Sequence, residues 1–311
     1  MASGRCRCFG FGIDCKMRAR ADFIAVLRHA FAPLLVCAIA LLPATAQGTG
    51  VAMVTDLQGK ATASIQGRSR DLTILDELEA EAMVQLGPGT TLVVLYLDTG
   101  YEYVCKGAAT IDFRPGQPEA QSGAKPERRN LTLGKGGKDI RIRPVGMVQG
   151  AMVMRGIRAD TQIQLLNLDR TRTLETRPEF RWKALQPGLE YGFELLDETG
   201  RTILESQVNA ASMNLPAGVK LREGVPYVWK LSARLPNGRT YTTSSEFTIA
   251  PADVRVQARE LRPATSAPLS ARIAYAAWLD QMELKDEARK YWMAASAERP
   301  ESSRLHALAA Q

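Results

Sequence analysis

The sequence contains only two histidines in 311 residues, His29 and His306. A Ser-His-Asp or Cys-His arrangement needs an imidazole base, and zinc sites are built from clustered cysteine and histidine. The motifs G-x-S-x-G, H-E-x-x-H and G-x-G-x-x-G are also missing. We therefore predict a protein that is not an enzyme, with no catalytic, cofactor-binding or metal-binding residue.

The chain also lacks a hydrophobic run long enough to span a bilayer comfortably. Its N-terminal apolar run, Phe31 to Leu42, is 12 residues long, whereas a spanning helix needs about 20. A basic stretch from Met17 to Arg28 precedes the run, and the small residues of Pro43-Ala44-Thr45-Ala46 follow it. This order is typical of a secretory signal peptide.

We accordingly predict a signal peptide over residues 1–46, cleavage after Ala46 and a periplasmic protein of a bacterial cell envelope. An uncleaved signal anchor or a buried helix is the alternative. Gln47, not a cysteine, stands directly after the cleavage site, so no lipid anchor is expected. No stable transmembrane segment is expected after cleavage either. Met17 begins a well-proportioned signal by itself, which suggests that translation starts there.

Removal of residues 1–46 lowers both the number of cysteines and the net charge. Cys105 is then the only cysteine, so no internal disulfide can form. We interpret it as a buried strand residue, with a reactive thiol as the alternative. Removing residues 1–46 removes six basic and two acidic residues and leaves a net charge of +3. Much of that charge lies in residues 114–143, so no nucleic-acid partner is expected.

Short, regularly punctuated apolar segments predict a small all-β domain over residues 50–113. Thr91 to Leu97 is continuously apolar, as in a central strand covered on both faces. Asp98-Thr99-Gly100 then turns into a strand on which Tyr101, Tyr103 and Cys105 share one face.

These features, with the turn at Gly59 and the segment Leu75-x-x-Leu78, resemble the FecR-type periplasmic domain. The resemblance implies a β-domain that contacts other proteins. Members of that family relay periplasmic signals to an anti-sigma segment, but this chain has no matching cytoplasmic domain and no spanning helix after the signal. Direct control of a sigma factor is therefore not expected.

Residues 114–150 are rich in Gly, Pro and basic residues, and we predict a basic linker there. A phosphate-binding loop is the less favoured alternative for its Gly-Lys tract, because the Walker spacing and its Ser/Thr are absent. The positive charge of the linker favours an anionic envelope surface or peptidoglycan as a further partner. Its candidate interaction residues are Lys135, Lys138, Arg141 and Arg143.

A second β unit is predicted over residues 161–251, with about seven short strands. Three alternating segments carry the pattern: Pro178-x-Phe180-x-Trp182, Tyr227-x-Trp229-x-Leu231-x-Ala233 and Ser245-x-Phe247-x-Ile249. They resemble immunoglobulin-like or fibronectin type III-like modules, which implies a β-sandwich used for binding or spacing. Asn237-Gly238 predicts a hairpin.

From residue 268 to residue 311, the apolar residues recur at helical spacing and no longer at every second position. The segment around Ala276, Ala288, Ala295 and Pro300 resembles one tetratricopeptide repeat, followed by a short third helix. One such repeat cannot bury its own face, so it must dock on the sandwich or on a partner. The candidate interaction residues of this segment are Trp278, Tyr291 and Trp292.

Two weaker alternatives remain open. Asp76, Glu77, Glu79 and Glu81 form an acidic cluster that suits a carboxylate-based hydrolase or calcium, although a solvated face explains it better. Trp182, Tyr191 and Trp229 would suit a sugar-stacking surface, although their alternation favours a core position. The sequence thus predicts a mainly β interaction or accessory protein with a protein partner; a glycan-binding or peptidoglycan-binding module is the alternative.

Overall fold

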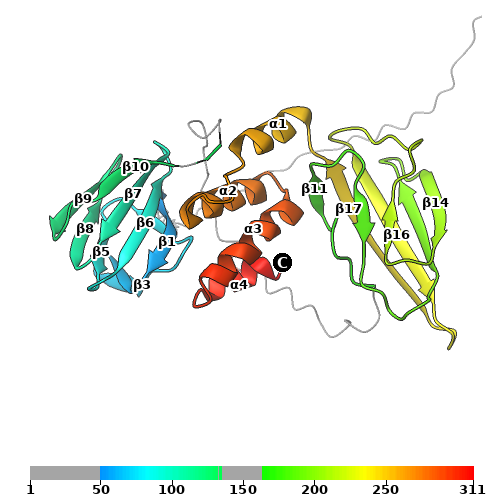
Figure 1. Cartoon of the computed structure of the whole chain (residues 1–311), viewed down its shortest axis with the longest axis horizontal. Helices are drawn as coiled ribbons and strands as arrows, with labels where there is room; N and C mark the ends of the chain where they lie inside the picture. The colour runs from blue at the N-terminus through cyan, green and yellow to red at the C-terminus, as the bar shows by residue number, and fades with distance from the viewer. Residues whose placement is uncertain (1–49, 132, 135–162) are drawn as a thin grey trace, which may run out of the picture. The chain divides into compact units, whose positions relative to one another are not determined.

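The computed structural model describes residues 50–131, 133–134 and 163–311. The predicted signal peptide lies outside the described residues, as do Lys135, Lys138, Arg141 and Arg143. The described chain is mainly β, with several antiparallel sheets and four helices, three of them in the predicted C-terminal region (Figure 1). The predicted fold class is therefore confirmed. No helix among the described residues has the length and apolar character needed to cross a membrane.

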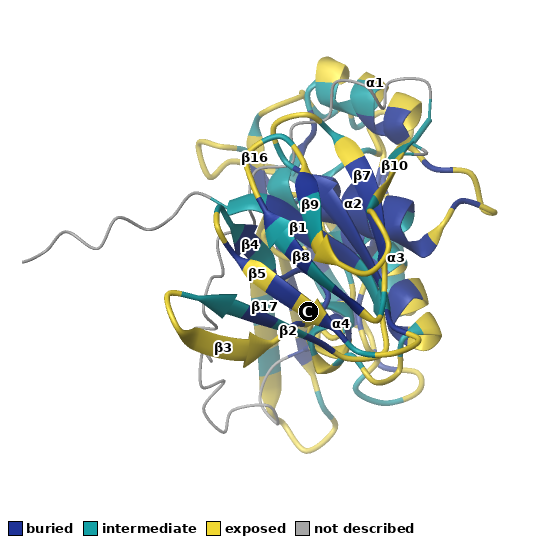
Figure 2. Cartoon of the chain, turned by 90° about the vertical axis from the view of Figure 1, so that its left-hand side faces the viewer, coloured by how far each residue is buried: buried dark blue, intermediate teal, exposed yellow. Residues whose placement is uncertain are grey.

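The first β-domain consists of two five-stranded sheets that enclose a common core. In spatial order, one sheet contains β10 (Glu127–Asn130), β7 (Tyr101–Lys106), β6 (Thr91–Tyr96), β1 (Gly50–Gln58) and β4 (Glu77–Glu79). The other contains β3 (Arg68–Asp71), β2 (Ala61–Ile65), β5 (Met83–Leu86), β8 (Ala109–Phe113) and β9 (Pro118–Ser122). The edge strand β3 is exposed along its length, as Figure 2 shows.

Strand β6 is central and buried on both faces, as its apolar run predicts. Leu92, Val94 and Tyr96 point into the core between the two sheets. Leu95 points the other way and packs against the helices, together with Met53 of β1. A continuous apolar run is required here because neither face of the strand meets water.

The predicted linker is wrong at its start, because strands β9 and β10 extend the first β-domain to residue 130. Strand β9 pairs with β8, and β10 pairs with β7, so each adds an edge to one sheet. Both strands are polar and largely lack the alternation of a half-buried strand, since an edge strand carries many solvated side chains. That composition is also typical of a linker, which explains the error.

The second β unit is built from seven strands. The larger sheet has the order β11 (Thr171–Thr173), β17 (Thr240–Ile249), β16 (Pro226–Arg234), β13 (Tyr191–Leu196) and β14 (Thr202–Val208). The smaller one pairs β12 (Glu179–Arg181) with β15 (Ser212–Asn214). The aromatic residues of the predicted alternations meet in one core, where Phe180 lies 5.0 Å from Phe193 and 5.1 Å from Trp229 between ring centroids. Gly238 has φ +82° in the loop between β16 and β17, which is the turn that the Asn-Gly pair predicts.

The helices are α1 (Ala252–Leu261), α2 (Leu269–Gln281), α3 (Lys285–Glu298) and α4 (Ser303–Ala309). The last three match the predicted helical tail, whereas α1 was not predicted. Pro300 follows the end of α3, and Ala276, Ala288 and Ala295 are fully buried between helices. Small residues at these positions allow the helices to approach closely.

Helix α2 is buried on nearly all sides (Figure 2) because it packs on the first β-domain as well as on its neighbouring helices. Its residues share a core with Met53, Ile74, Leu75 and Leu95. Arg299, just after α3, binds Asp56 of β1 through both carboxylate oxygens, at 3.0 and 2.9 Å. The helical tail therefore docks within its own chain, and the first β-domain supplies a docking face that the sequence did not indicate.

Candidate functional site

Two of the three aromatic residues predicted to face a partner are core residues instead. Trp278 and Trp292 are each 2% exposed and belong to the cluster that joins the helices to β1. The indole Nε1–H of Trp292 donates to Asp280 Oδ2 at 2.7 Å, so its polar atom is satisfied internally. The two rings therefore cannot form a contact surface, because they are buried in this cluster.

The acidic cluster around residue 76 does not form a metal site. Asp76 is buried and makes ion pairs with Arg70 at 2.8 Å and with Arg304 at 2.7 Å. Burial raises the pKa of Glu77, and Arg304 partly opposes that shift. No group of three or more metal-ligating side chains occurs within the described ranges. Asp76 thus connects α4 to the first β-domain.

Cys105 is a buried free cysteine in β7. Burial raises the pKa of its thiol to about 12. Because the thiolate is the nucleophilic form, this thiol is expected to be inert at neutral pH. The interpretation as a buried strand residue is confirmed.

Tyr291, the third aromatic candidate, lies half-buried in a hollow among three helices. The hollow has a volume of about 770 Å³. It is lined by Leu174 and Glu175 of the sandwich and by thirteen residues of the helical region: Ala252, Arg255, Val256, Arg259, Arg262, Pro263, Ala264, Thr265, Arg272, Glu287, Lys290, Tyr291 and Ala294. We call this the helical groove. Five lining residues are basic and two are acidic, so its charge is positive.

Helix α1 and the residue after it contribute three arginines to the helical groove. Arg255 and Arg259 are spaced i, i+4 on one face of α1, and Arg262 is the C-cap residue that follows Leu261. Like charges at this spacing destabilise a helix by about 0.2–0.5 kcal/mol per pair. Ala258 and Leu261 of α1 are buried in the helical core.

The three arginines differ in their partners. Arg255 makes an ion pair with Glu223. Arg262 hydrogen-bonds the hydroxyl of Tyr275, a neutral group, and this contact raises its pKa. Arg259 is exposed and has no side-chain hydrogen bond or ion pair with any described residue. Two of the three guanidinium groups therefore have no carboxylate bonded to them.

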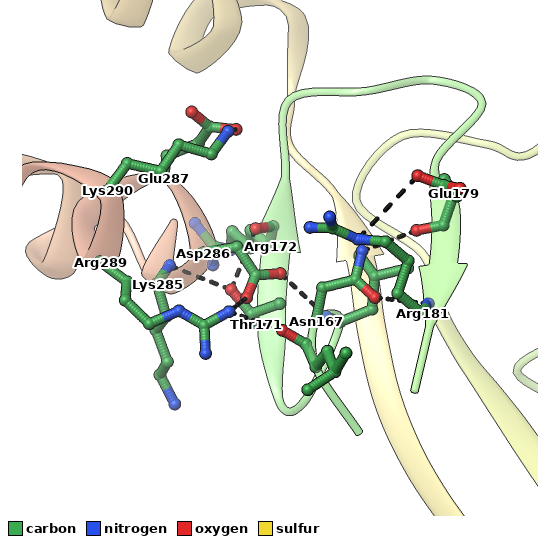
Figure 3. A network of polar contacts seen from close by, with 12 residues as sticks. Asn167, Thr171, Arg172, Glu179, Arg181, Lys285, Asp286, Glu287, Arg289 and Lys290 are labelled. Atoms are coloured by element: carbon green, nitrogen blue, oxygen red, sulfur yellow. Dashed lines mark hydrogen bonds and ion pairs between the residues drawn. The ribbon is translucent and has the colours of Figure 1, made fainter. Parts of the chain in front are cut away.

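The opposite wall comes from α2 and α3, and its cations are paired. Arg272 holds Glu298, with Nη2 2.8 Å from Oε2. Lys290 Nζ lies 2.8 Å from Glu287 Oε1, and Figure 3 shows this pair on a different side of α3 from Asp286 and Arg289. These pairs hold the wall in place and leave little free charge on it.

The floor of the helical groove is apolar and aromatic. The rings of Tyr291 and Tyr275 pack nearly perpendicular to each other, with their centroids 4.9 Å apart. Burial raises the pKa of Tyr291, so its hydroxyl stays protonated at neutral pH. Val256 of α1 lines the same groove and is 41% exposed. A partner could therefore bury apolar surface as well as satisfy charge.

The groove rests against the sandwich through a polar joint at the start of α3 (Figure 3). Asp286 Oδ2 accepts the backbone N–H of Leu168 at 2.8 Å, and Arg289 donates to the carbonyl of Leu166 at 2.6 Å. The hydroxyl of Thr171 donates to the carbonyl of Glu283 at 2.9 Å. Burial raises the pKa of Asp286, and the Leu168 N–H and Arg289 oppose that shift.

A second hollow, of about 640 Å³, lies on the outer face of the larger sandwich sheet. Its lining is mostly polar and includes Gln207, Lys230, Ser232, Thr242 and Ser244. Trp182, Tyr191 and Trp229 do not reach this face, because they are 0–1% exposed in the core. The sugar-stacking surface considered for them is therefore not formed by these rings.

Arg255, Arg259 and Arg262 were not among the predicted site residues, because α1 was not predicted as a helix. A signal was present: Pro251 and Pro263 delimit a segment with arginines at helical spacing and with Val254, Ala258 and Leu261. The segment is short and five of its eleven residues are charged, and no element was predicted for it.

Comparisons with known proteins leave the chain without a family. No protein-family model and no curated protein matches it. Among solved structures, it is similar to CopC from Methylosinus trichosporium OB3b, with a TM-score of 0.23 and 20% identity over 29% of this chain and 96% of that one. It is also similar to a β-glucuronidase of Parabacteroides merdae, with a TM-score of 0.20 and 9% identity over 64% of this chain and 26% of the enzyme. At these TM-scores, neither fold nor function can be transferred to this chain.

Proposed function

We propose that this chain is an exported protein of the bacterial cell envelope that binds another protein and does so through the helical groove. Export rests on the signal-like order of residues 17–46. The binding role rests on one observation above all: a groove with an apolar floor carries two guanidinium groups that no carboxylate of the described chain binds.

The way the domains are joined supports this assignment. The tail uses α2 to dock on the first β-domain and the start of α3 to contact the sandwich. The helical groove is what these contacts leave open. Arginine and tyrosine are enriched in protein interfaces, where they combine apolar contact with directed hydrogen bonds.

Site-specific photo-crosslinking in cells tests the proposal. A photoreactive phenylalanine analogue replaces Val256 in the groove, and in a matched strain it replaces Met293, which is 58% exposed on α3 but does not line the groove. We expect an adduct of defined mass from position 256 and none from position 293. The absence of any adduct at 256, or identical adducts at both positions, would contradict the proposal.

Localisation is tested separately. Cell fractionation with intact-mass measurement should find the protein in the periplasm, beginning at Gln47. A full-length chain in the cytoplasmic fraction would refute export and leave the groove proposal to the crosslinking result.

Glycan binding is the alternative function, and the polar hollow on the sandwich is the observation that favours it. Lys230 and Ser232 lie on adjacent outward positions of β16 and would supply hydrogen bonds to sugar hydroxyls. Sedimentation with purified sacculi distinguishes the two functions. Glycan binding is supported if the sacculi retain the wild-type protein but not a Lys230→Ala, Ser232→Ala variant. If the sacculi do not retain the wild-type protein at low salt, this alternative function is refuted.

A further inference from the structure

We infer that the partner segment held by the helical groove is an acidic peptide, in which two carboxylates lie next to an apolar side chain. This inference rests on the proposed function and specifies its ligand. Arg259 and Arg262 would bind the carboxylates, and Val256 and Tyr291 would contact the apolar side chain.

The pairing of the groove's charges points to an anion. Three of the five basic lining residues have a carboxylate partner in the chain: Arg255 with Glu223, Arg272 with Glu298 and Lys290 with Glu287. The remaining two are three residues apart in the chain, with Arg259 in the last turn of α1 and Arg262 at its C-cap. Guanidinium groups bind carboxylates through two parallel hydrogen bonds, so this pair would receive two carboxylates at similar spacing.

The apolar part of the groove favours a peptide over a small inorganic anion. Leu174, Pro263, Ala264 and Ala294 line the same hollow as the arginines. A volume of about 770 Å³ has room for several side chains. A phosphate or sulfate ion would leave this apolar surface uncovered.

The position of the acidic residues disfavours a membrane as the partner. Glu175 and Glu287 line the same groove as the arginines, and Glu175 has no side-chain partner among the described residues. A bilayer rich in anionic lipids would bring negative headgroups against these carboxylates. A narrow peptide can place its carboxylates beside the arginines without doing so.

Fluorescence anisotropy with three labelled 12-residue peptides tests the inference on the full processed chain. All three peptides carry leucine at the same four positions, and the other eight are glutamate, glutamine or lysine. We expect saturable binding of the glutamate peptide, with affinity that falls as the salt concentration rises, and at least about tenfold weaker binding of the glutamine peptide. Equal binding of these two, or no binding of the glutamate peptide up to millimolar concentration, would overturn the inference.

Matched variants locate the site. Arg259→Gln removes an exposed side chain that has no partner in the described chain, so folding should be unaffected, which a thermal melt checks. This substitution should weaken binding of the glutamate peptide about tenfold. The control is Arg239→Gln, which changes an exposed arginine in the β16–β17 loop and should leave the affinity unchanged. Equal affinity of the wild type and the Arg259→Gln variant would contradict the assigned site.

A vesicle assay separates the peptide from the membrane. Suppose that the protein floats with phosphatidylglycerol vesicles in a way that depends on Arg259 and yet fails to bind the glutamate peptide. This pair of results would show that the groove binds a lipid surface and not an acidic peptide. Failure of the peptide experiments together with a specific adduct at Val256 would refute the acidic ligand and leave the proposed function standing. Failure of the crosslinking experiment would remove the proposed function itself.

Discussion

At the scale of single residues, buried polar groups in this chain act mainly in structure. Asp280, at the end of α2, is an example: its carboxylate accepts the Trp292 indole N–H at 2.7 Å. Burial raises its pKa to about 6, with the Trp292 hydrogen bond and Lys285 opposing the shift. An acid whose folded pKa exceeds its unfolded pKa stabilises the fold fully at low pH, and that contribution is lost as the pH rises through the folded value.

Replacing Asp280 with Asn should therefore stabilise the protein above pH 6. The amide oxygen still accepts the indole N–H, and no charge is buried. From the rise of the pKa from 3.8 to about 6, we expect a gain on the order of 3 kcal/mol at pH 7.5 that disappears near pH 4. Urea unfolding of both proteins across this pH range measures the difference. Glu190→Gln makes the same carboxyl-to-amide change at an exposed residue and is the matched control.

The buried thiol of Cys105 gives a second prediction at this scale. With a pKa of about 12, almost none of it is thiolate at pH 8. A disulfide reagent such as DTNB should modify the native protein very slowly, and the denatured protein within minutes. Fast modification of the native chain would show that β7 opens, or that the thiol is accessible.

At the scale of elements, ion pairs tie the helical tail to the first β-domain. The Arg299–Asp56 pair is bidentate, and its side chains are only 16% and 13% exposed. Removing one partner from such a pair leaves a charge that is poorly hydrated and unpaired. Exposed pairs such as Arg114–Glu119 are expected to contribute much less.

Asp56→Ala should therefore destabilise the protein by about 3 kcal/mol. Adding Arg299→Met should recover much of this loss, because the second change removes the stranded guanidinium. Denaturation midpoints of the two single variants and the double variant measure the coupling. Additive effects would show that the pair does not act as a unit, and Glu119→Ala provides the exposed comparison.

At the scale of the whole molecule, one face of the first β-domain is a core surface only because the helices cover it. Register places Met53, Leu95 and Glu102 side by side across β1, β6 and β7. Arg129 of β10 pairs with Glu102 and reaches Ser270 at the start of α2. The β-domain and the helices therefore bury apolar surface together.

Deleting residues 252–311 should expose this face and make the remaining chain aggregate. Light scattering and binding of a hydrophobic dye measure the outcome. Leu95→Lys in the shortened chain should reduce aggregation, because the new lysine lies opposite Glu102 across the strand pair. If the shortened chain stays monomeric without Leu95→Lys, the face does not need the helices to cover it.

Local patterns of the sequence predicted much of the fold. The alternation around Trp229 predicted the sandwich core, the apolar run at Thr91–Leu97 predicted the central strand, and the small residues of the tail predicted paired helices. Each pattern follows from a period of 2 or 3.6 residues, which a few neighbouring positions suffice to reveal. Polar edge strands such as β9 and the charged helix α1 were missed, because few of their residues are buried.

The sequence by itself determined which segments are extended, which are helical and which side chains are apolar enough to form cores. Only the tertiary structure decided that Trp278 and Trp292 are covered and that Arg259 and Arg262 share a groove with Tyr291. The physical reason is that burial depends on contacts between residues far apart in the chain. Helix α2 packs against β1, more than 200 positions earlier, and no local period carries that information.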